Sequence, residues 1–573
     1  MNLQKKISRD STGIGNKMDY KKEYERWRSC ATDNDIKAEL EGMSEEQIED
    51  AFYRDLAFGT GGLRGTIGAG TNRMNMYVVA KASQGLANYL LSTTTVPSVV
   101  IGYDSRIKSD VFARTAAGVF AANGLTVHFW PQLLPVPTVS FATRYLHASA
   151  GVMITASHNP SKYNGYKVYG ADGCQITTEA TKAILSEINA LDIFSEVKSM
   201  DFERAIAEGK VKYIDPAVLT AFIEEVKSQS VLFGDPLDRE VAIVYSPLNG
   251  TGLVPVTRVL QENGFTNITV VEEQSNPDGN FPTCPYPNPE IREAMEVGLE
   301  YCERTGADLL LATDPDCDRC GIAVKTPTGD YQLLTGNEVG LLLLDFICSQ
   351  RIKHNQMPED PTFVKTIVTM DLAEKIAEHY GVKIVNVLTG FKFIGEVIGR
   401  MDDERNYICG FEESYGYLTG SYVRDKDGVN AAFMICEMFA FYKTQGISLL
   451  EKLEEIYREY GYCLNTLHSY EFPGSAGMEK MSQIMKIFHE GLESLGEEQV
   501  LRTEDYSLGL NGLPASDVLK YFYEGDGVTG SVVIRPSGTE PKLKAYISVT
   551  AADRTAAEAV EEQITAELEK RLK

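Results

Sequence analysis

The sequence predicts an α/β protein of several domains, and three observations lead to this fold class. The chain has 573 residues, too many for one hydrophobic core, so about three to five domains are expected. Apolar, β-branched runs alternate with stretches of helical periodicity, as in βαβ units around a largely parallel sheet. After about residue 462 the order changes to an amphipathic stretch, strand-like runs and a charged helical end. That order indicates a smaller α+β domain at the C-terminus.

The first clear βα unit lies near residue 100. Residues 97–106 read PSVVIGYDSR, an apolar strand that ends in a polar loop. Residues 110–124 follow with apolar side chains at helical spacing and a terminal glycine. The same order of strand, loop and helix returns at 239–252 and 361–369. These returns predict repeated, similar α/β domains.

Glycine- and proline-containing stretches near Gly209, Pro327 and Gly461 mark the expected linkers between domains. We therefore expect a leader and helical extension over 1–45, α/β domains over 46–209, 210–327 and 328–460, and the α+β domain over 461–573.

Composition excludes some classes of partner. There are 55 Lys and Arg against 81 Asp and Glu, a net charge of −26, so no nucleic acid or anionic membrane is expected as a partner. No apolar run is long enough to cross a bilayer, and the N-terminus lacks the apolar centre of a secretory signal. Ten cysteines without a repeated spacing are typical of reduced thiols. We expect a cytoplasmic protein.

Residues 312–324, ATDPDCDRCGIAV, predict a metal site. Asp314, Asp316 and Asp318 alternate after the apolar run 309–311, so in an extended chain their carboxylates point the same way. Three hard oxygens suit Mg²⁺. A calcium-binding EF-hand loop would need Gly where Arg319 stands and Glu where Lys325 stands. A solvated acidic turn is the remaining alternative.

Two stretches have the composition of phosphate-binding loops. FGTGGLRGTIGAG (58–70) combines glycines with one cation, Arg64, and offers close backbone amides and a guanidinium fork. In VIRPSGTEPKLKAYI (533–547), Arg535 ends a strand, followed by Ser537, Gly538 and Thr539 and then by Lys542 and Lys544. A flexible turn and an ordinary hairpin are the respective alternatives.

Two further loops carry polar groups among glycines. GFEESYGYLTG (410–420) offers Glu412 and Ser414 to sugar hydroxyls, and LTGFKFIG (388–395) places Lys392 among glycines and aromatics, where desolvation would tune its pKa.

Ser157 follows the apolar run of GVMITASHNPSKYNGYK (151–167). A serine hydrolase needs a histidine beside the hydroxyl, but His158 is the next residue and is not expected to turn back onto it. The G-x-S-x-G elbow is also absent. A phosphate carrier instead needs a divalent cation, phosphate-gripping cations and an acid or base. The aspartates, Arg64, Arg535 and Lys167 supply these, so the carrier interpretation is favoured.

Taken in order, these motifs resemble the α-D-phosphohexomutase superfamily, from about Phe52 to Ile547. FGTGGLRG and VRDKDGV (423–429) look most like the branch that contains phosphoglucomutase and phosphopentomutase enzymes. The resemblance implies four domains around a central cleft, three similar α/β units and a smaller last one.

The resemblance also implies roles for residues. Ser157 would carry the phosphoryl group, and its phosphate with Asp314, Asp316 and Asp318 would hold Mg²⁺. Lys167 would be the general acid/base, with Arg64 and Lys392 beside the transferring group; His158 is also counted as catalytic. Glu412 and Ser414 would select the sugar, and the remaining phosphate would be gripped by Arg535, Ser537, Gly538 and Thr539. Arg319 and Lys544 complete the expected substrate-binding set.

The implied reaction interconverts α-D-glucose 1-phosphate and glucose 6-phosphate, with glucose 1,6-bisphosphate as intermediate and activator. A phosphopentomutase acting on ribose or deoxyribose phosphates is the main alternative, and a phosphomannomutase fits Glu412-Glu413-Ser414 less well. A non-catalytic phosphosugar sensor would be expected to have a damaged catalytic set, yet the set is complete. A monomer or dimer is expected.

Overall fold

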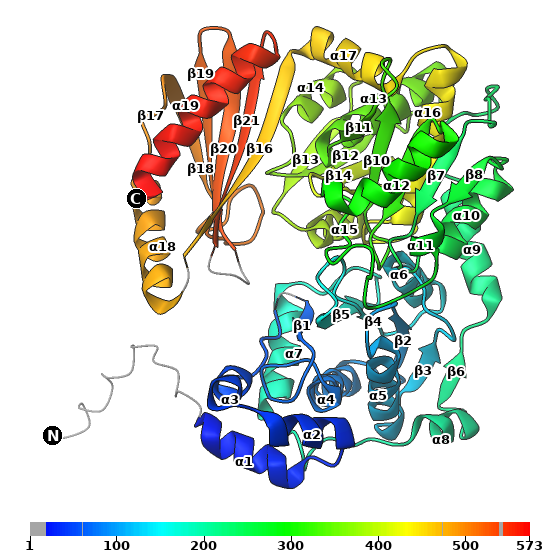
Figure 1. Ribbon diagram of the computed structural model, residues 1–573, viewed down its shortest axis with the longest axis vertical. Helices are drawn as coiled ribbons and strands as arrows, with labels where there is room; N and C mark the ends of the chain where they lie inside the picture. The colour runs from blue at the N-terminus through cyan, green and yellow to red at the C-terminus, as the bar shows by residue number, and fades with distance from the viewer. Residues whose placement is uncertain (1–18, 60, 473, 538–541, 573) are drawn as a thin grey trace.

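The computed structural model describes residues 19–59, 61–472, 474–537 and 542–572. Four β-sheets succeed one another along the chain, each with its own helices (Figure 1). We call them the first to fourth units. The first, blue to cyan, lies at the bottom of Figure 1; the second and third, green to yellow, lie above it; the fourth, orange and red, stands at the upper left. The predicted α/β class with a last α+β unit is confirmed.

The helical extension begins at Tyr20 in the described part of the chain and packs on the first unit. Trp27 is fully buried, and its ring makes edge contacts with the rings of Phe52, Tyr77 and Phe194. The predicted extension over 1–45 contains α1 (Tyr20–Cys30) and α2 (Asn34–Gly42), and α3 (Glu45–Phe52) follows at its end.

The first sheet has the order β1-β5-β4-β2-β3-β6. Four strands are parallel, whereas β5 runs antiparallel to β4 and β1 antiparallel to β5. The strands are β1 (Gly62–Thr66), β2 (Ser98–Tyr103), β3 (Thr126–Phe129), β4 (Ala150–Ile154), β5 (Tyr163–Gly170) and β6 (Val211–Tyr213). The helices are α4 (Met76–Thr93), α5 (Ser109–Ala122), α6 (Val136–Tyr145), α7 (Thr178–Ala190) and α8 (Phe202–Ala207).

The second sheet has the order β11-β10-β9-β7-β8. Its strands are β7 (Ile243–Ser246), β8 (Ile268–Val270), β9 (Leu309–Thr313), β10 (Cys320–Lys325) and β11 (Tyr331–Leu334). Its helices are α9 (Pro216–Lys227), α10 (Leu253–Glu262), α11 (Glu272–Ser275) and α12 (Arg292–Thr305). Because β11 belongs to this sheet, the sheet extends past residue 327, where we expected the second domain to end.

The third sheet has the order β13-β12-β14-β15. Its strands are β12 (Thr362–Thr366), β13 (Lys383–Val387), β14 (Tyr407–Glu412) and β15 (Gly416–Thr419). Its helices are α13 (Gly336–Lys353), α14 (Leu372–His379), α15 (Phe391–Arg400), the short 3-10 helix η1 (Glu404–Asn406), α16 (Gly428–Thr444) and α17 (Leu449–Tyr460).

The first three sheets repeat one topology. The orders β5-β4-β2-β3, β10-β9-β7-β8 and β15-β14-β12-β13 are equivalent. In each, the third strand of the repeat turns directly into an antiparallel neighbour. The similar segments near residues 100, 240 and 361 are β2, β7 and β12, the first strands of the repeats. The predicted repetition of similar α/β units is therefore confirmed, while the domain limits stay predictions.

The fourth sheet is antiparallel throughout, in the order β16-β21-β20-β19-β18-β17. Its elements are β16 (Tyr462–Glu471), α18 (Gly474–His489), β17 (Ser494–Leu495), β18 (Glu498–Asp505), β19 (Leu519–Gly525), β20 (Val528–Pro536), β21 (Lys542–Ala551) and α19 (Arg554–Leu572). It packs on the third unit through an apolar cluster that includes Leu388 and Tyr546. Lys520 also donates to Asp371 at 2.7 Å. No helix among the described residues has the length and apolarity needed to cross a membrane.

Candidate active site

The candidate site is built at equivalent positions of the first three units. Ser157 lies between β4 and β5, the aspartates lie between β9 and β10, and Glu412 and Ser414 lie at the turn between β14 and β15. Each loop therefore follows the last parallel strand of its repeat, at the carboxyl end where α/β proteins bind ligands. Similar units that face one another bring the equivalent loops together.

Ser157 presents its hydroxyl to the second unit. The residue is 4% exposed and has a left-handed backbone with φ of 51°, a conformation that non-glycine residues adopt at a cost. Its N–H donates to Thr155 Oγ1 at 2.8 Å, and its Oγ donates to Asp314 Oδ2 at 2.7 Å. The bond to Thr155 thus fixes the Ser157 backbone, and the Ser157 hydroxyl lies against the Asp314 carboxylate of the second unit.

The expectation that His158 could not reach Ser157 is wrong. The His158 Nδ1 atom lies 3.2 Å from Ser157 Oγ, because the left-handed turn at Ser157 brings adjacent side chains to one side. Burial, with the charges of Arg319 and Arg64, holds the pKa of His158 well below its usual value, so a neutral ring meets the hydroxyl. Within the described ranges no carboxylate bonds its other ring nitrogen, so a hydrolase triad lacks its third member.

Arg106 fixes the serine loop, a role that sequence reasoning missed. Its side chain and that of Asp104 are fully buried and form an ion pair, with Nε 3.4 Å from Oδ2. Both residues belong to the YDSR end of the 97–106 segment, but nothing in the pattern shows what they bond. The guanidinium donates to the backbone carbonyls of Ser157, Asn159, Pro160 and Tyr163.

We expect Arg106→Gln to destabilise the protein by about 3–5 kcal/mol, because it leaves the buried Asp104 carboxylate without its ion-pair partner. We also expect a lower kcat, because the serine loop loses the hydrogen bonds that hold it. The double variant Asp104→Asn/Arg106→Gln should recover much of the melting temperature but not kcat, since a glutamine cannot serve four carbonyls. Arg114→Gln, which breaks an exposed pair with Glu203, is the control. Full activity in the double variant would contradict the positioning role.

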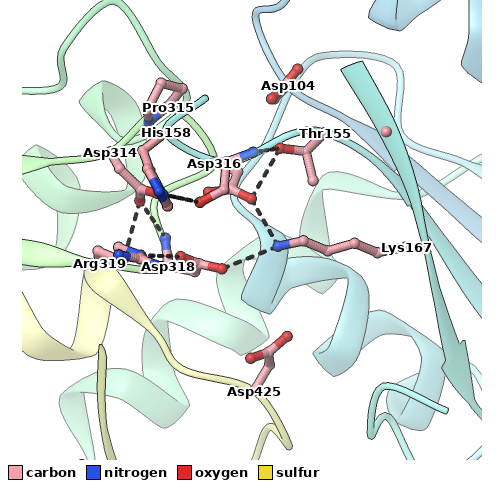
Figure 2. A network of polar contacts seen from close by, with 12 residues as sticks. Asp104, Thr155, His158, Lys167, Asp314, Pro315, Asp316, Asp318, Arg319 and Asp425 are labelled. Atoms are coloured by element: carbon pink, nitrogen blue, oxygen red, sulfur yellow. Dashed lines mark hydrogen bonds and ion pairs between the residues drawn. The ribbon is translucent and has the colours of Figure 1, made fainter. Parts of the chain in front are cut away.

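The three aspartates converge by a different route from the one expected. Asp314, Asp316 and Asp318 are fully buried, and their ligand atoms all lie within 4.8 Å of one another. The backbone is not extended: the Cys317 N–H donates to the Asp314 carbonyl at 2.9 Å, and φ of Cys317 is 51°. A tight turn between β9 and β10, rather than strand alternation, gathers the carboxylates (Figure 2).

The cluster fits a metal ion. The Oδ1 atoms of Asp316 and Asp318 are buried without a hydrogen-bond partner, which is costly unless something else satisfies them. Burial and the charges of Asp316 and Asp318 raise the pKa of Asp314 well above its usual value. A hard divalent cation would supply the missing partner and relieve this repulsion.

Two lysines face the cluster from opposite units. Lys167 Nζ lies 3.0 Å from Asp316 Oδ2 and 3.2 Å from Asp318 Oδ2; dashed lines mark both ion pairs in Figure 2. Lys426 Nζ, from the third unit, lies 3.0 Å from Asp318 Oδ2. Burial alone would lower the pKa of Lys167, but the two carboxylates raise it. Lys426 was not predicted as a site residue, although it lies in VRDKDGV (423–429), which we used only for the resemblance.

Arg319 is the last residue of the turn that carries the three aspartates. Its N–H donates to Asp314 Oδ1 at 3.1 Å, and its guanidinium pairs with Glu290, a residue that no motif singled out. Burial opposes the charge of Arg319, but Glu290 and Asp318 raise its pKa above the usual value. The guanidinium is thus held beside the cluster as a permanent cation.

Arg64 lies in a strand rather than in a free loop. In the register of β1 and β5, Arg64 faces Gly165 and Gly62 faces Lys167, so Arg64 and Lys167 project from one face of the sheet. Arg64 Nη1 donates to Asn159 Oδ1 at 3.1 Å. The glycines serve packing: a Cβ on Gly62, whose φ is 152°, would lie 1.9 Å from the Tyr166 carbonyl oxygen.

Lys392 is likewise in a regular element, as the second residue of α15. Burial lowers the pKa of its ammonium, as expected from its aromatic setting, and its Nζ lies 5.0 Å from the centre of the Phe393 ring. Its carbonyl accepts from Cys174 Sγ at 3.2 Å, so α15 begins against the first unit.

The third-unit loop places two carboxyl groups side by side. Glu412 is 5% exposed, and burial raises its pKa against the opposing charges of Lys426 and Arg319. Burial and the charge of Glu412 raise the pKa of Glu413 to about 7, with Arg535 opposing the shift. A partly protonated carboxyl beside a carboxylate can both donate and accept hydrogen bonds. Ser414, the next residue in this turn, is half-buried.

The fourth unit contributes a short cationic edge, formed by Arg535 near the end of β20 and Lys544 near the start of β21. Arg535 on β20 pairs in register with Lys544 on β21, and the Ser537 N–H donates to the Lys542 carbonyl at 2.7 Å. Gly538 and Thr539 lie outside the described residues. Because the charge of Arg535 acts on Glu413, the edge lies within electrostatic range of the third-unit loop.

The sequence and the fold of the chain match known proteins. Four profiles of the phosphoglucomutase/phosphomannomutase family match the chain one after another. Alpha/beta/alpha domain I matches residues 55–193, domain II matches 220–329, domain III matches 335–460 and the C-terminal domain matches 515–567. A phosphoglucomutase from Staphylococcus saprophyticus is 36% identical over 540 residues, which cover 91% of this chain and 96% of that protein.

Solved structures share the architecture. A phosphoglucomutase/phosphomannomutase family protein from Burkholderia thailandensis aligns with a TM-score of 0.67 at 17% identity, over 90% of this chain and 97% of that one. The open form of parafusin, a phosphoglucomutase from Paramecium, aligns with a TM-score of 0.68 at 18% identity, over 90% and 95%. The chain belongs to the phosphoglucomutase/phosphomannomutase family.

Proposed function

We propose that the chain is a phosphoglucomutase, an isomerase that interconverts α-D-glucose 1-phosphate and glucose 6-phosphate through a phosphoserine at residue 157. The observation that carries this proposal is the Ser157 hydroxyl bonded to Asp314 at 2.7 Å, beside two buried carboxylate oxygens without partners. Relatives named phosphoglucomutase, similar over most of both chains, support the choice of reaction.

The reaction consists of two phosphoryl transfers. Phosphoserine 157 gives its phosphoryl group to the free sugar hydroxyl, so one P–O bond breaks, another forms, and glucose 1,6-bisphosphate results. The intermediate turns over and returns its other phosphoryl group to Ser157. Lys167 moves the hydroxyl proton, while Arg64, Lys392 and His158 line the transferring group. Such transfers depend on positioning and charge more than on covalent work by the protein.

Charge balance explains the composition of the site. A phosphoserine adds roughly −1.5 to −2 of charge beside three buried carboxylates, which a second phosphate could approach only against strong repulsion. Asp314, Asp316, Asp318 and the phosphate on Ser157 would hold Mg²⁺, which supplies positive charge opposite the transferring oxygens when bound. Lys167, Lys426 and Arg319 offset the remaining charge.

Substrate binding is assigned to the turn between β14 and β15, to Arg319 and to the fourth unit. Glu412 and Ser414 would bond sugar hydroxyls, and Arg319 would lie on the substrate side of the metal. Arg535 and Lys544, with Ser537, Gly538 and Thr539, would grip the phosphate that does not react. All ten cysteines are free thiols, which is consistent with the proposed cytoplasmic location.

A coupled assay tests the proposal, with glucose 1-phosphate, Mg²⁺ and trace glucose 1,6-bisphosphate as reagents and formation of glucose 6-phosphate as the readout. We expect turnover that depends on both the metal and the bisphosphate. With ribose 1-phosphate as the substrate and formation of ribose 5-phosphate as the readout, kcat/KM should be lower. A higher value for the pentose would replace the proposal with a phosphopentomutase, and no turnover of either would overturn it.

Replacing Arg535 should affect binding more than chemistry. Arg535→Gln removes a charge-assisted bond to the non-reacting phosphate, worth about 1.5–3 kcal/mol, so we expect KM for glucose 1-phosphate to rise about 10–100-fold with a smaller change in kcat. Arg502→Gln on strand β18 of the same sheet, whose side chain is 61% exposed, is the matched control. A KM equal to that of the wild type would contradict the assignment.

A further inference from the structure

A second pocket lies where the first three units meet. It has a volume of about 870 Å³, within the range of about 300–1,000 Å³ typical of small-molecule sites. Its walls come from the end of α6, from α9, from the end of α13, from η1 and from the loop after β15. Figure 1 shows α6 at the top of the first unit, below the units that complete the pocket. None of its lining residues belongs to the candidate active site.

Three arginines line this pocket of an acidic protein. Its lining includes Arg144, Arg351 and Arg405 together with Glu225 and Glu404, and Arg405 is paired with Asp403 at 2.6 Å, while the whole chain has a net charge of −26. Concave surfaces of one charge concentrate ligands of the opposite charge. Because Arg405 already has a carboxylate partner, Arg351 and Arg144 are the arginines of the lining that can attract an anion.

Arg351 lacks an acidic partner. Its Nη1 donates to the Gln356 carbonyl at 3.3 Å, but its Nε is buried without a hydrogen bond. In the part of the chain that the structure describes, no carboxylate forms an ion pair with it. Burial lowers the pKa of this guanidinium. A half-buried cation without a counter-ion is costly, and an anion in the pocket would remove that cost.

Arg144 is crowded by a like charge. Its Nη1 donates to the Ser421 carbonyl at 2.6 Å and its Nη2 to Glu404 at 3.3 Å. The buried guanidinium of Arg424 bonds the same carboxylate and the same carbonyl. Burial, and then the charge of Arg424, lower the pKa of Arg144. Two guanidiniums thus share the Glu404 carboxylate, and the charge of Asp172 also acts on Arg144.

The partly exposed ring of Tyr145 lines the pocket. Tyr145 is 51% exposed and stacks on Phe141, with ring centres 5.4 Å apart and planes inclined by 26°. The exposed face of Tyr145 can stack on a planar group of a ligand. Because the ring lies on the element that carries Arg144, one ligand could meet both.

We propose that this pocket is a second binding site, for a small phosphate monoester that carries a planar ring. A phosphate offers enough acceptor oxygens to meet Arg351 and Arg144 from two different units at once, and the ring stacks on Tyr145. The site is separate from the proposed sugar-phosphate site, and its occupancy does not depend on the assigned reaction.

Isothermal titration tests the proposal, with AMP as the probe for the joined phosphate and ring, and with inorganic phosphate and adenosine as the separate parts. We expect AMP to bind one site per chain more tightly than either part. Glucose 6-phosphate at about ten times its KM should leave the Kd for AMP unchanged. Displacement of AMP by the sugar phosphate would assign the binding to the active site and overturn the proposal, as would the absence of AMP binding.

Variants locate the site. Arg351→Gln should weaken AMP binding about 10–100-fold, and Tyr145→Ala should weaken AMP but not inorganic phosphate. Arg351→Gln should melt no lower than the wild type, because it removes a half-buried cation without a counter-ion, and it should keep wild-type turnover, since Arg351 contacts no active-site residue. Arg258→Gln on α10, a surface residue paired with Glu262, should bind AMP like the wild type. An unchanged Kd in Arg351→Gln would overturn the proposal.

Discussion

Ser157→Ala is expected to abolish turnover while leaving the fold intact. The variant removes the oxygen that would carry the phosphoryl group, and no other hydroxyl in the described chain bonds the aspartates from the same position: Thr155, the nearest, donates to Asp316 at 3.0 Å. Loss of a covalent nucleophile reduces rates on the order of 10⁴-fold or more. The coupled glucose 1-phosphate assay measures the loss.

The fold should survive because the Ser157 backbone, not its hydroxyl, holds the loop. Its N–H bond to Thr155 and its carbonyl bond to Arg106 remain in the variant. Ser161→Ala, in the same loop, is the matched control and should retain activity. Mass spectrometry after incubation with glucose 1,6-bisphosphate should find one phosphoryl group on the 151–167 segment of the wild type and none in Ser157→Ala. An active alanine variant would end the carrier assignment.

Asp318→Asn is expected to have the second-largest effect. It removes one of three carboxylates that would hold the metal and the shared acceptor of Lys167 and Lys426. We expect kcat to fall about 10²–10³-fold, which corresponds to several kcal/mol of lost charge stabilisation. Excess Mg²⁺ should restore part of the activity if the loss is one of metal affinity.

A thermal-shift titration separates a metal role from a structural one. A ligand that binds only the folded state raises the melting temperature with its concentration, so Mg²⁺ should stabilise the wild type and shift Asp318→Asn much less. Asp330→Asn, in the turn before β11, is the control and should respond like the wild type. Equal Mg²⁺ shifts in all three proteins would contradict a metal site at the cluster.

Periodicity and local chemistry in the sequence were sufficient to predict the architecture. The alternation of apolar runs and helical stretches depends on contacts close in sequence, and β2, β7 and β12 lie where the three similar segments indicated. The candidate metal ligands were found for the same reason, because Asp314, Asp316 and Asp318 are near neighbours in the chain. The family resemblance added the order of the loops and their proposed roles.

Local backbone conformation was predicted less well at the site. The glycines around Arg64 belong partly to an edge strand, Lys392 lies in the first turn of a helix, and the acidic segment is a turn. For Arg64 the deciding interaction comes from elsewhere in the chain, in the pairing of β1 with β5, whereas the acidic segment turns through a local bond from Cys317 N–H to the Asp314 carbonyl. Propensity and composition show neither the partner strand of β1 nor the turn at Cys317.

The sequence by itself determined the α/β class, the repetition of the units and which residue types could perform phosphoryl transfer. Only the tertiary structure decided that the loops of the repeats occupy one topological position, that Arg106 holds the serine loop, and that Lys426 and Glu290 join the site. The physical reason is that these are contacts between groups tens to hundreds of residues apart, and a contact of that kind leaves no local pattern. The arginine-lined pocket among three units arises in the same way, from side chains that are adjacent only after folding.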